Sequence, residues 1–227
     1  MNIRYSILPY MYTLFYQAHY TGSTVMRALS WEFPSEPALA SCETQFFLGP
    51  AILVTPVLAQ GAVTVNGVFP GVGKGAVYYD WYNQSAVIAG AGENITIDAP
   101  LGHIPVYLRG GYIIPTQEPA MVTRDARKNP WSLIAALSLE GTAAGSLYVD
   151  DGESIVQNST LYVEVSHFLP PPFKLLRNSS PYHTLSTYHL PLPFLLPIQK
   201  PTPLTSLPKI VHSHSLHPPR LPPRHLQ

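Results

Sequence analysis

Cysteine is almost absent from this 227-residue chain, in which Cys42 is the only one. A single cysteine excludes a disulfide within the chain. No histidine or lysine stands beside Cys42, so nothing in the sequence would activate it as a nucleophile. We therefore expect a small, buried, apolar side chain at this position rather than a reactive thiol.

Long uninterrupted apolar runs are missing as well. Thr44–Gly73 carries no charged residue, yet Pro50, Pro56 and Pro70 interrupt it. A membrane span needs about 20 continuous apolar residues. The first ten residues also lack the basic and apolar regions of a signal peptide. We expect neither a membrane nor, at a net charge of zero, a nucleic acid as partner.

Glycine and acidic residues stop well before the end of the chain. The last glycine is Gly152 and the last of the 13 acidic residues is Glu164, whereas proline and histidine become frequent from His167 onward. Proline at this density favours extended, polyproline-like backbone. We therefore predict that residues 167–227 form a disordered Pro/His-rich tail.

Two functional interpretations of that tail stay open beside disorder. His212, His214 and His217 could bind a metal, although no acidic residue or cysteine lies near them to complete a ligand set. The sequence PPRLPPR could be a ligand for an SH3-type domain.

The N-terminal segment Asn2–Tyr20 has the spacing of a helix. Its apolar residues recur at steps of three and four, which places them on one face. They are Ile3, Ile7, Met11, Leu14, Phe15 and Ala18. Pro9 predicts a kink or a second helix start, and Gly22 predicts the end. Five tyrosines surround this face, which suits a helix packed on two sides.

Short apolar segments separated by turn residues make up the middle of the chain, as is typical of antiparallel sandwich sheets. We expect strands at Ser23–Leu29, Phe46–Leu58, Ala76–Tyr82, Asn94–Ile97, Leu133–Leu139, Ser146–Val149 and Leu161–Val165. A turn-rich connection from Trp31 to Ser41 and a loop over Gly141–Gly145 would join some of them. Asn66-Gly67 predicts a hairpin turn between Val63–Val65 and Val68–Phe69.

The stretch DAPLGHIPVYLRGGYIIPTQEP, residues 98–119, predicts two further buried strands. Ile104–Leu108 and Tyr112–Ile114 are apolar, and Arg109-Gly110-Gly111 between them allows a sharp turn. Pro105 and Pro115 cannot donate to a ladder, which favours strand ends or sheet edges. No helix opens after the glycine pair, so it is not a phosphate-binding loop.

Asp150-Asp151-Gly152-Glu153 is the only cluster of carboxylates in the sequence. Paired carboxylates can act as acid and base or bind a cation. Neighbours on a strand, however, point to opposite faces, and Asp-Gly after an apolar strand is typical of a turn. We favour the turn and leave the site as an alternative. The sequence contains no Ser/His/Asp arrangement, CxxC pair or phosphate loop, and we expect no cofactor.

Four sequons begin at Asn83, Asn94, Asn158 and Asn178, and the first three are candidate N-glycosylation sites, since Asn178 lies in the tail. Three of them within the part expected to fold fit a surface matured in a secretory compartment.

Four stretches together carry a specific resemblance. They are NIRYSILPYMYTLFYQAHYTGSTVMRAL from Asn2, FFLGPAILVTPVL from Phe46, APLGHIPVYLRGGYIIPTQEPA from Ala99 and LYVDDGES from Leu147. In this order and spacing they resemble the carboxyl-terminal part of glycoside hydrolase family 31, of the maltase and acid α-glucosidase type. The resemblance covers about residues 2–165.

The resemblance implies an (α/β)8 catalytic barrel followed by two β-sandwich domains. Residues 1–50 would then be the last helix and strand of the barrel with a connection, and residues 51–118 the proximal sandwich. Residues 119–166 would be an incomplete distal sandwich. The fold class is thus mainly β, preceded by a remnant of the barrel.

The implied reaction is retaining hydrolysis of terminal α-linked glucose, with an α-glucoside or maltooligosaccharide as substrate of the parent enzyme. The family's two catalytic aspartates lie in motifs that do not occur here, so we expect no catalytic residue and no activity in this chain alone. The parent would be secreted or lysosomal/vacuolar.

Two other interpretations stay open. The chain could be a non-enzymatic sugar-binding or scaffolding sandwich, in which Tyr78, Tyr79, Trp81 and Tyr82 offer rings to a sugar rather than packing in the core. It could also be an inactive product of a truncated gene.

Overall fold

The computed structural model describes residues 2–152, 161–168 and 186–189, and every structural statement below concerns these residues. Helices are α1 (Asn2–Ser6), α2 (Leu8–Thr21), α3 (Leu29–Glu32) and α4 (Thr123–Ala126), with 3-10 turns η1 (Pro37–Ser41) and η2 (Val72–Lys74). Strands are β1 (Met26–Arg27), β2 (Phe46–Leu48), β3 (Ile52–Val54), β4 (Thr64–Val68), β5 (Tyr78–Asp80), β6 (Asn94–Asp98), β7 (Val106–Arg109), β8 (Tyr112–Gln117), β9 (Trp131–Ala136), β10 (Thr142–Val149), β11 (Leu161–Phe168) and β12 (Ser186–His189).

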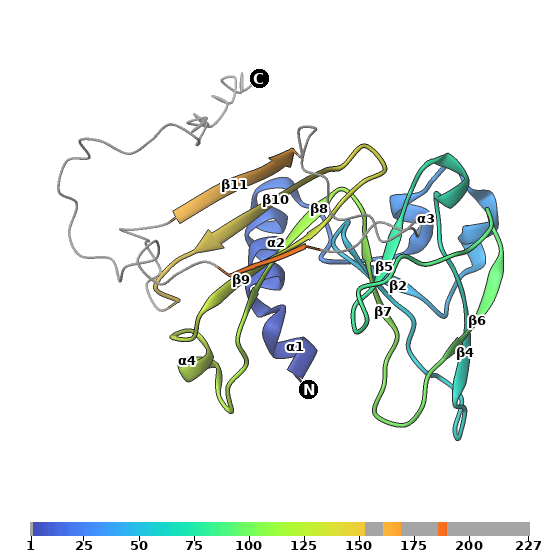
Figure 1. Cartoon of the computed structure of the whole chain (residues 1–227), viewed down its shortest axis with the longest axis horizontal. Helices are drawn as coiled ribbons and strands as arrows, with labels where there is room; N and C mark the ends of the chain where they lie inside the picture. The colour runs from blue at the N-terminus through green and yellow to red at the C-terminus, as the bar shows by residue number, and fades with distance from the viewer. Residues whose placement is uncertain (1, 153–160, 169–185, 190–227) are drawn as a thin grey trace, which may run out of the picture.

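The strands form two five-stranded sheets and one two-stranded sheet. The first sheet has the order β1-β2-β3-β7-β5, the second has the order β11-β10-β8-β9-β12, and β4 pairs with β6. All pairs are antiparallel except β8 with β10. Figure 1 shows the second sheet on the left with α2 across it, and the first sheet and β4–β6 on the right. The prediction of a mainly β, antiparallel fold is therefore confirmed.

Successive side chains in the strands of the first sheet point to opposite faces, so they belong to two different cores. One face, with Phe47, Leu53 and Tyr107, packs with Ile97 of β6 and with residues from the α3–η1 connection. The opposite face, with Ile52, Tyr79, Val106 and Leu108, packs with α2 and with Ile114 and Ala136 of the second sheet. The first sheet is therefore covered on both faces.

Helix α2 begins and ends where the sequence predicts. The helical run breaks at Ile7, and α2 restarts at Leu8 with Pro9 in its first turn, where a missing N–H costs nothing. Gly22 closes the helix with φ +71°, and its N–H donates to the Ala18 carbonyl. The predicted second start and the predicted end are both confirmed.

The turn between β2 and β3 lies directly against α2. The Tyr10 hydroxyl donates to the Leu48 carbonyl oxygen over 2.9 Å, and the Ala51 N–H donates to the same hydroxyl oxygen over 3.3 Å. Gly49 in this turn has φ +54°, and a Cβ there would lie 2.5 Å from the Tyr10 hydroxyl oxygen and 2.6 Å from Leu14. Glycine is thus required both for the backbone angle and for the close approach.

The expectation of one strand over Phe46–Leu58 is wrong. The chain turns at Gly49-Pro50, so β2 and β3 pair as a hairpin in which Phe46 faces Val54. Pro56 lies beyond β3, outside any strand. The apolar composition of this segment comes from two strands buried in the middle of the first sheet, not from one long strand.

The expectation of a hairpin around Asn66-Gly67 is also wrong. Both residues lie inside β4, which pairs along its length with β6. Gln45 explains the glycine: its side chain accepts from the Val68 N–H and donates to the Val68 carbonyl, and a Cβ on Gly67 would lie 2.8 Å from its nitrogen. Close approach of a side chain, not a turn, selects glycine here.

The predicted pair of strands around Arg109-Gly110-Gly111 exists, but its members lie in different sheets. Strand β7 belongs to the first sheet and β8 to the second, so the glycine pair carries the chain from one sheet to the other. Pro105 precedes β7, as expected. Pro115 lies inside β8. Strand β9 pairs with β8 over its whole length, whereas β10 is in register with β8 only at Tyr112.

Two predicted boundaries differ from the structure at the ends of strands. The expected strand Ser23–Leu29 shrinks to β1, because Leu29 already begins α3. The expected loop Gly141–Gly145 is mostly strand, because β10 begins at Thr142. A Cβ on Gly145 would collide with the Ile113 carbonyl of β8, so this glycine allows two backbones to approach.

The expectation of a tail without regular structure from His167 onward is wrong at two places. Strand β11 continues to Phe168, and β12 pairs with β9 in register Ser186 to Ala135. Ser-Thr-Tyr-His is a proline-free segment with a β-branched and an aromatic residue, which suits a strand. The remaining tail, with His212, His214, His217 and PPRLPPR, lies outside the described residues.

Two glycine substitutions separate backbone strain from crowding. Gly22→Ala places a Cβ at positive φ with no atom within 4 Å, so we expect a loss of about 1–2 kcal/mol in the free energy of unfolding. Gly49→Ala adds a collision with Tyr10 and Leu14, which costs roughly a further 1–3 kcal/mol. Urea titration of the full chain measures both, and an equal loss in the two variants would contradict the close approach of α2 to this turn.

Candidate functional site

The aromatic residues considered as a sugar platform have separate environments. Tyr78 and Tyr79 are 1% and 0% exposed, and their hydroxyls donate to the carbonyls of Pro70 and Leu137. Trp81 is half-buried against the core that contains α2, and Tyr82 is 45% exposed. Tyr78 and Tyr79 are thus core residues that no sugar can reach.

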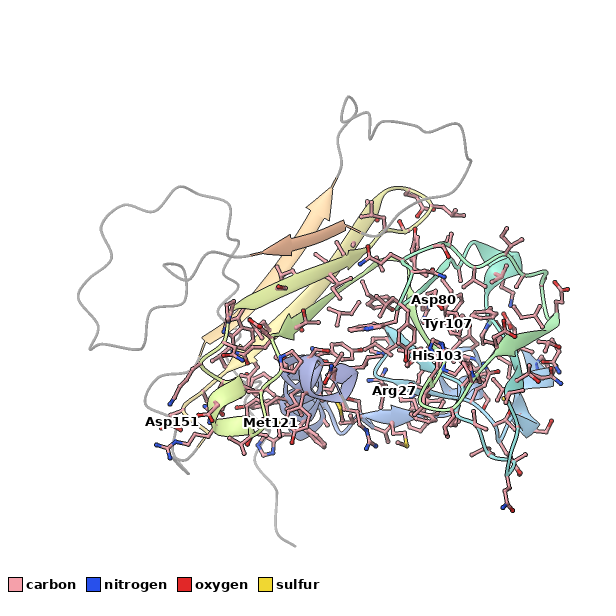
Figure 2. The ribbon with its side chains drawn as sticks, turned by 60° about the horizontal axis from the view of Figure 1, so that its bottom comes forward. Arg27, Asp80, His103, Tyr107, Met121 and Asp151 are labelled. Atoms are coloured by element: carbon pink, nitrogen blue, oxygen red, sulfur yellow. The ribbon has the colours of Figure 1, made fainter. Side chains whose placement is uncertain are left out.

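Asp150 is buried at 7% exposure, and its carboxylate is occupied by neighbours. The Tyr12 hydroxyl lies 2.9 and 2.7 Å from its two oxygens, and the Gly152 N–H donates to Oδ1. Arg127 donates to its main-chain carbonyl. Asp151, by contrast, is exposed (Figure 2), so the two aspartates do not share one environment.

Tyrosine rings join α2 to the end of β10 around this carboxylate. Tyr16 stacks on Tyr148 with ring centroids 3.9 Å apart, and Tyr12 lies 5.7 Å from the same ring. Burial, followed by the hydrogen bond to Asp150 and its charge, raises the pKa of Tyr12 to about 12. The same causes raise the pKa of Tyr148. These hydroxyls therefore stay protonated as donors, and the cluster fastens a sheet to a helix rather than transferring protons.

Two further hydrogen bonds strengthen this attachment. The Tyr148 N–H donates to the Thr13 hydroxyl over 3.0 Å, and Gln17 donates to the Ser146 hydroxyl over 2.8 Å. Thr13 is itself buried and donates to the Pro9 carbonyl. The side of α2 that carries these residues is thus engaged with β10.

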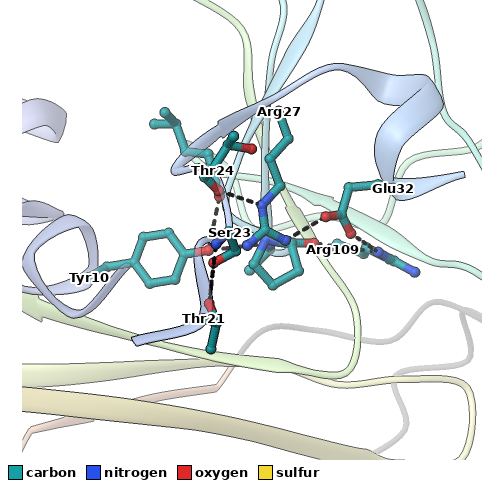
Figure 3. A network of polar contacts seen from close by, with 10 residues as sticks. Tyr10, Thr21, Ser23, Thr24, Arg27, Glu32 and Arg109 are labelled. Atoms are coloured by element: carbon teal, nitrogen blue, oxygen red, sulfur yellow. Dashed lines mark hydrogen bonds and ion pairs between the residues drawn. The ribbon is translucent and has the colours of Figure 1, made fainter. Parts of the chain in front are cut away.

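An ionic network fixes the connection after α2 against the first sheet (Figure 3). Glu32 in α3 accepts from Arg27 of β1 over 2.6 Å and forms an ion pair with Arg109 of β7 at 3.5 Å. Arg27 also donates to the Thr24 carbonyl. The Arg109 guanidinium lies 4.5 Å from the centre of the Phe33 ring. One carboxylate shared by two guanidiniums suits a structural clamp, because both of its oxygens are already bound by protein cations.

An open groove of about 820 Å³ lies between η1 and β4. Its walls are mostly small or aliphatic, with Leu39, Val65 and Val68 among them, and Cys42 lies in it half-buried. Cys42 packs partly against the core around Phe47, in line with an apolar role. Phe69 is the one aromatic residue lining the groove and is 1% exposed, so the groove offers no ring on which a sugar could stack.

Within the described ranges, no group of three or more His, Cys, Asp or Glu side chains could hold a metal ion. No helix among these residues combines the length and the apolar character needed to cross a bilayer.

The outward face of α2 is the most unusual surface of the described part. Leu8, Tyr12 and Phe15 follow one another at steps of four and three, so they share one side of the helix. They are 37, 44 and 56% exposed, although the opposite side of the same helix is core. Met26 and Trp31, in the segments that follow, are 61 and 60% exposed. An apolar face on a helix already packed on its other side is typical of an interface.

Comparison with known proteins agrees with this architecture. Residues 22–114 match the model of the glycosyl hydrolase family 31 C-terminal domain. Over 164 residues the chain is 67% identical to an α-glucosidase of Aspergillus niger, a match that covers 72% of this chain and 17% of that protein. The lysosomal α-glucosidase of Mus musculus is 42% identical, over 67% of this chain and 17% of its own length.

A crystal structure of the glucosidase II α subunit aligns with a TM-score of 0.65 at 32% identity and covers 72% of this chain and 18% of that chain. The fold and these matches therefore define a C-terminal β module of a glycosidase. The chain belongs to glycoside hydrolase family 31 and matches the C-terminal part of its α-glucosidases. It spans less than a fifth of the length of these relatives.

Sequence reasoning missed the partners of buried Asp150 and half-buried Glu32. Tyr12 and Asp150 are 138 positions apart, so no local pattern could connect them. Glu32 and Arg109 are likewise remote in sequence. A weak signal existed for Tyr12, since it was one of five tyrosines on the predicted helix, but nothing distinguished it from the other four.

Asp150→Asn tests the cluster that holds β10 on α2. An amide nitrogen replaces one oxygen that accepts from tyrosine, and hydrogen bonds to a buried charge contribute roughly 1.5–3 kcal/mol. We expect a loss of that order in the free energy of unfolding, measured by urea titration. Asp151→Asn, one residue along and exposed, should change it by less than about 0.5 kcal/mol. Similar effects of the two substitutions would show that Asp150 is not a specific anchor.

Alkaline pH should unfold the chain through its buried tyrosines. Burial raises the pKa of Tyr79 to about 12, and burial together with the Asp80 charge does the same for Tyr107. An unfolded tyrosine ionises near pH 10 (about its reference pKa). Because the folded pKa of each tyrosine is higher, the stability that the two hydroxyls contribute is fully present below about pH 10. It is lost as the pH rises from about 10 towards 12.

Tyr79→Phe isolates one of these contributions. The variant loses the hydrogen bond to Leu137 at neutral pH, yet its stability should fall less steeply above about pH 10, since one ionising group is gone. Urea midpoints at about pH 8 and pH 11 measure the two slopes. A variant that loses stability as steeply as the unchanged chain would contradict the buried, neutral hydroxyl.

Proposed function

We propose that this chain is the C-terminal supporting part of a retaining α-glucosidase that removes terminal α-linked glucose from α-glucosides or maltooligosaccharides. The support is the identity of 67 and 65% to proteins named α-glucosidase in two Aspergillus species. A retaining site needs two carboxyl groups about 5–5.5 Å apart. Within the described residues the acidic groups that are buried or half-buried are held by arginine, lysine, tyrosine and backbone N–H groups, and we place the catalytic pair in another part of the enzyme.

In this proposal α1, α2 and the segment Ser23–Leu29 correspond to the last helix and strand of a catalytic barrel. Residues 51–118 would correspond to a proximal sandwich and residues 119–166 to part of a distal one. The chain from the barrel remnant to the distal sandwich would then form one continuous support, with α2 between the sheets and the catalytic body.

The observation that carries the proposal is the exposed apolar pair Leu8 and Phe15 on α2, next to Tyr12, which is itself engaged with Asp150. A water-soluble domain gains nothing from such a face, whereas a helix at the edge of a larger body buries it on assembly. Leu8 and Phe15 are already about half-buried, so completing their burial contributes roughly 1 kcal/mol each.

A lysosomal relative and the three sequons support maturation of the parent enzyme in a secretory compartment, with secretion or a lysosomal or vacuolar destination. Asn83 and Asn94 are exposed and are proposed as glycosylated positions, together with Asn158 outside the described residues. A sugar-binding sandwich is not favoured, because two of its four candidate rings are core residues.

The purified full chain should show no hydrolysis of maltose or of an aryl α-glucoside. The catalytic pair that a retaining site needs is proposed to lie in the part of the parent enzyme that this chain does not match, so we expect neither nucleophile nor acid here. Release of glucose or of the aryl alcohol measures the activity. Turnover that persists through purification and is blocked by a glucosidase inhibitor would overturn the assignment of this chain as a non-catalytic part.

A chimera tests the docking face directly. Residues 2–165 of this chain replace the matching segment of the Aspergillus niger α-glucosidase, and we expect an active, secreted enzyme. Phe15→Glu in the chimera should reduce the yield of active enzyme at least about tenfold, because a charge in an apolar interface costs several kcal/mol.

Leu101→Glu is the matched control for this substitution. Leu101 is also an exposed apolar residue, in a loop remote from α2 in sequence. We expect activity close to that of the unsubstituted chimera. Equal losses in the two variants would mean that the α2 face has no special role.

A further inference from the structure

Two hydrogen bonds fix the orientation of the Asn83 side chain in the turn after β5. The Asn83 Oδ1 atom accepts from both the Ser85 N–H and the Ser85 hydroxyl, over 2.8 and 2.6 Å. Both bonds use the oxygen of the carboxamide and leave its nitrogen outside the interaction. Asn83, Gln84 and Ser85 are all exposed. The acceptor nitrogen of this sequon can therefore carry a bulky group without disturbing the fold.

The turn is rigid enough to define where that group would lie. Asp80 Oδ1 accepts from the N–H groups of Tyr82 and Asn83, and the Asp80 carbonyl accepts from Gln84. The Asp80 N–H donates to Ser85 and closes the loop. Gln84 adopts φ +61°, which the surrounding hydrogen bonds maintain. The tip follows β5, the edge strand of the first sheet.

An exposed aromatic ring stands immediately before the acceptor. The Tyr82 hydroxyl donates to the Ile104 carbonyl over 2.9 Å, and its ring lies 4.0 Å from that of His103 at 32°. Figure 2 shows His103 near Asp80 and Tyr107, on the side where β5 and β7 pair. Nearly half of Tyr82 is still exposed, at 45%. A fixed, half-exposed ring is the kind of surface on which the apolar face of a sugar packs.

The second described sequon lacks both features. Asn94 is exposed in β6, but the Thr96 hydroxyl of its sequon donates to Asn66 on β4 rather than to Asn94. Asn94 borders the groove with aliphatic walls, where the one lining aromatic residue, Phe69, is buried. It therefore serves as an internal comparison for Asn83.

We propose that Asn83 carries an N-linked glycan whose first sugar packs on the Tyr82 ring. The inference rests on the secretory maturation in the proposed function. In the attachment, the Asn83 carboxamide nitrogen attacks C1 of the first sugar of a lipid-diphosphate-linked oligosaccharide. The N–C1 bond forms, the bond from C1 to the diphosphate oxygen breaks, the lipid diphosphate leaves with the electron pair, and one nitrogen proton passes to a base.

Glycopeptide mapping tests the attachment. The full chain is expressed in yeast behind a secretion leader, and peptides that contain Asn83 are analysed by mass spectrometry before and after treatment with peptide N-glycosidase. We expect a peptide in which Asn83 carries a glycan and in which enzymatic release converts this asparagine to an aspartate. An unmodified Asn83 in the secreted chain would overturn the proposal. The assay is independent of glucosidase activity, so it does not depend on whether the parent's substrate is correct.

The rate of enzymatic release under native conditions tests the contact with Tyr82. A ring contact that slows release about fivefold corresponds to about 1 kcal/mol, within the range for aromatic contacts. Release from Asn83 should therefore be about fivefold faster in Tyr82→Leu, which keeps apolar bulk without a ring. Tyr82→Phe keeps the ring and should release slowly, although it loses the hydrogen bond to Ile104.

Denatured protein provides the reference, in which all variants should release at one rate. Circular dichroism of Tyr82→Leu carrying Asn83→Gln shows whether the substitution alone leaves the fold intact. If native release is equal in Tyr82→Leu, Tyr82→Phe and the unchanged chain, the glycan does not pack on the ring and that part of the proposal is wrong.

Discussion

The apolar core shared by α2 and the two large sheets is the interaction on which the rest of the structure depends. Ile7, Tyr10 and Leu14 are 3, 6 and 4% exposed and meet side chains of both sheets there. Burial of such side chains contributes roughly 1.5–3 kcal/mol each, more than ion pairs near the surface, which are worth about 0–1 kcal/mol. The hydrogen bonds of Tyr10, the Asp150 cluster and the Glu32 clamp then fix the register of elements that this core holds together.

The elements of this core can be predicted from the sequence, but the way they pair cannot. Periodicity located α2, with its break near Pro9 and its end at Gly22, because these depend on neighbouring residues. It failed at Phe46–Leu58 and Asn66-Gly67, where glycine is explained by contacts with Tyr10 or Gln45 that come from elsewhere in the chain. The carboxylate cluster likewise needed Tyr12, 138 residues away, before its structural role was visible. Local chemistry predicts elements, whereas close approach of backbones is decided by the tertiary fold.

Two observations support the proposal that the chain braces the catalytic body of a glycosidase. The described acidic groups that are buried or half-buried are bound by neighbouring side chains and N–H groups, while α2 keeps apolar residues towards solvent after its other side has been buried. A support that braces a catalytic body needs both properties: stability without an active site, and a surface that is complete only on contact. The family membership agrees with this division, since the chain matches less than a fifth of each relative.

Thiol labelling at Phe15 tests this division most directly. Cys42 is the only cysteine, so Cys42→Ser gives a background in which Phe15→Cys is the single thiol, and Leu101→Cys is its control. In the isolated chain both thiols should react with an alkylating reagent at similar rates. In the chimera with the Aspergillus niger catalytic part, Phe15→Cys should become protected while Leu101→Cys stays reactive. Unchanged labelling of Phe15→Cys in an active chimera would contradict the account, because α2 would then not be the face that meets the catalytic body.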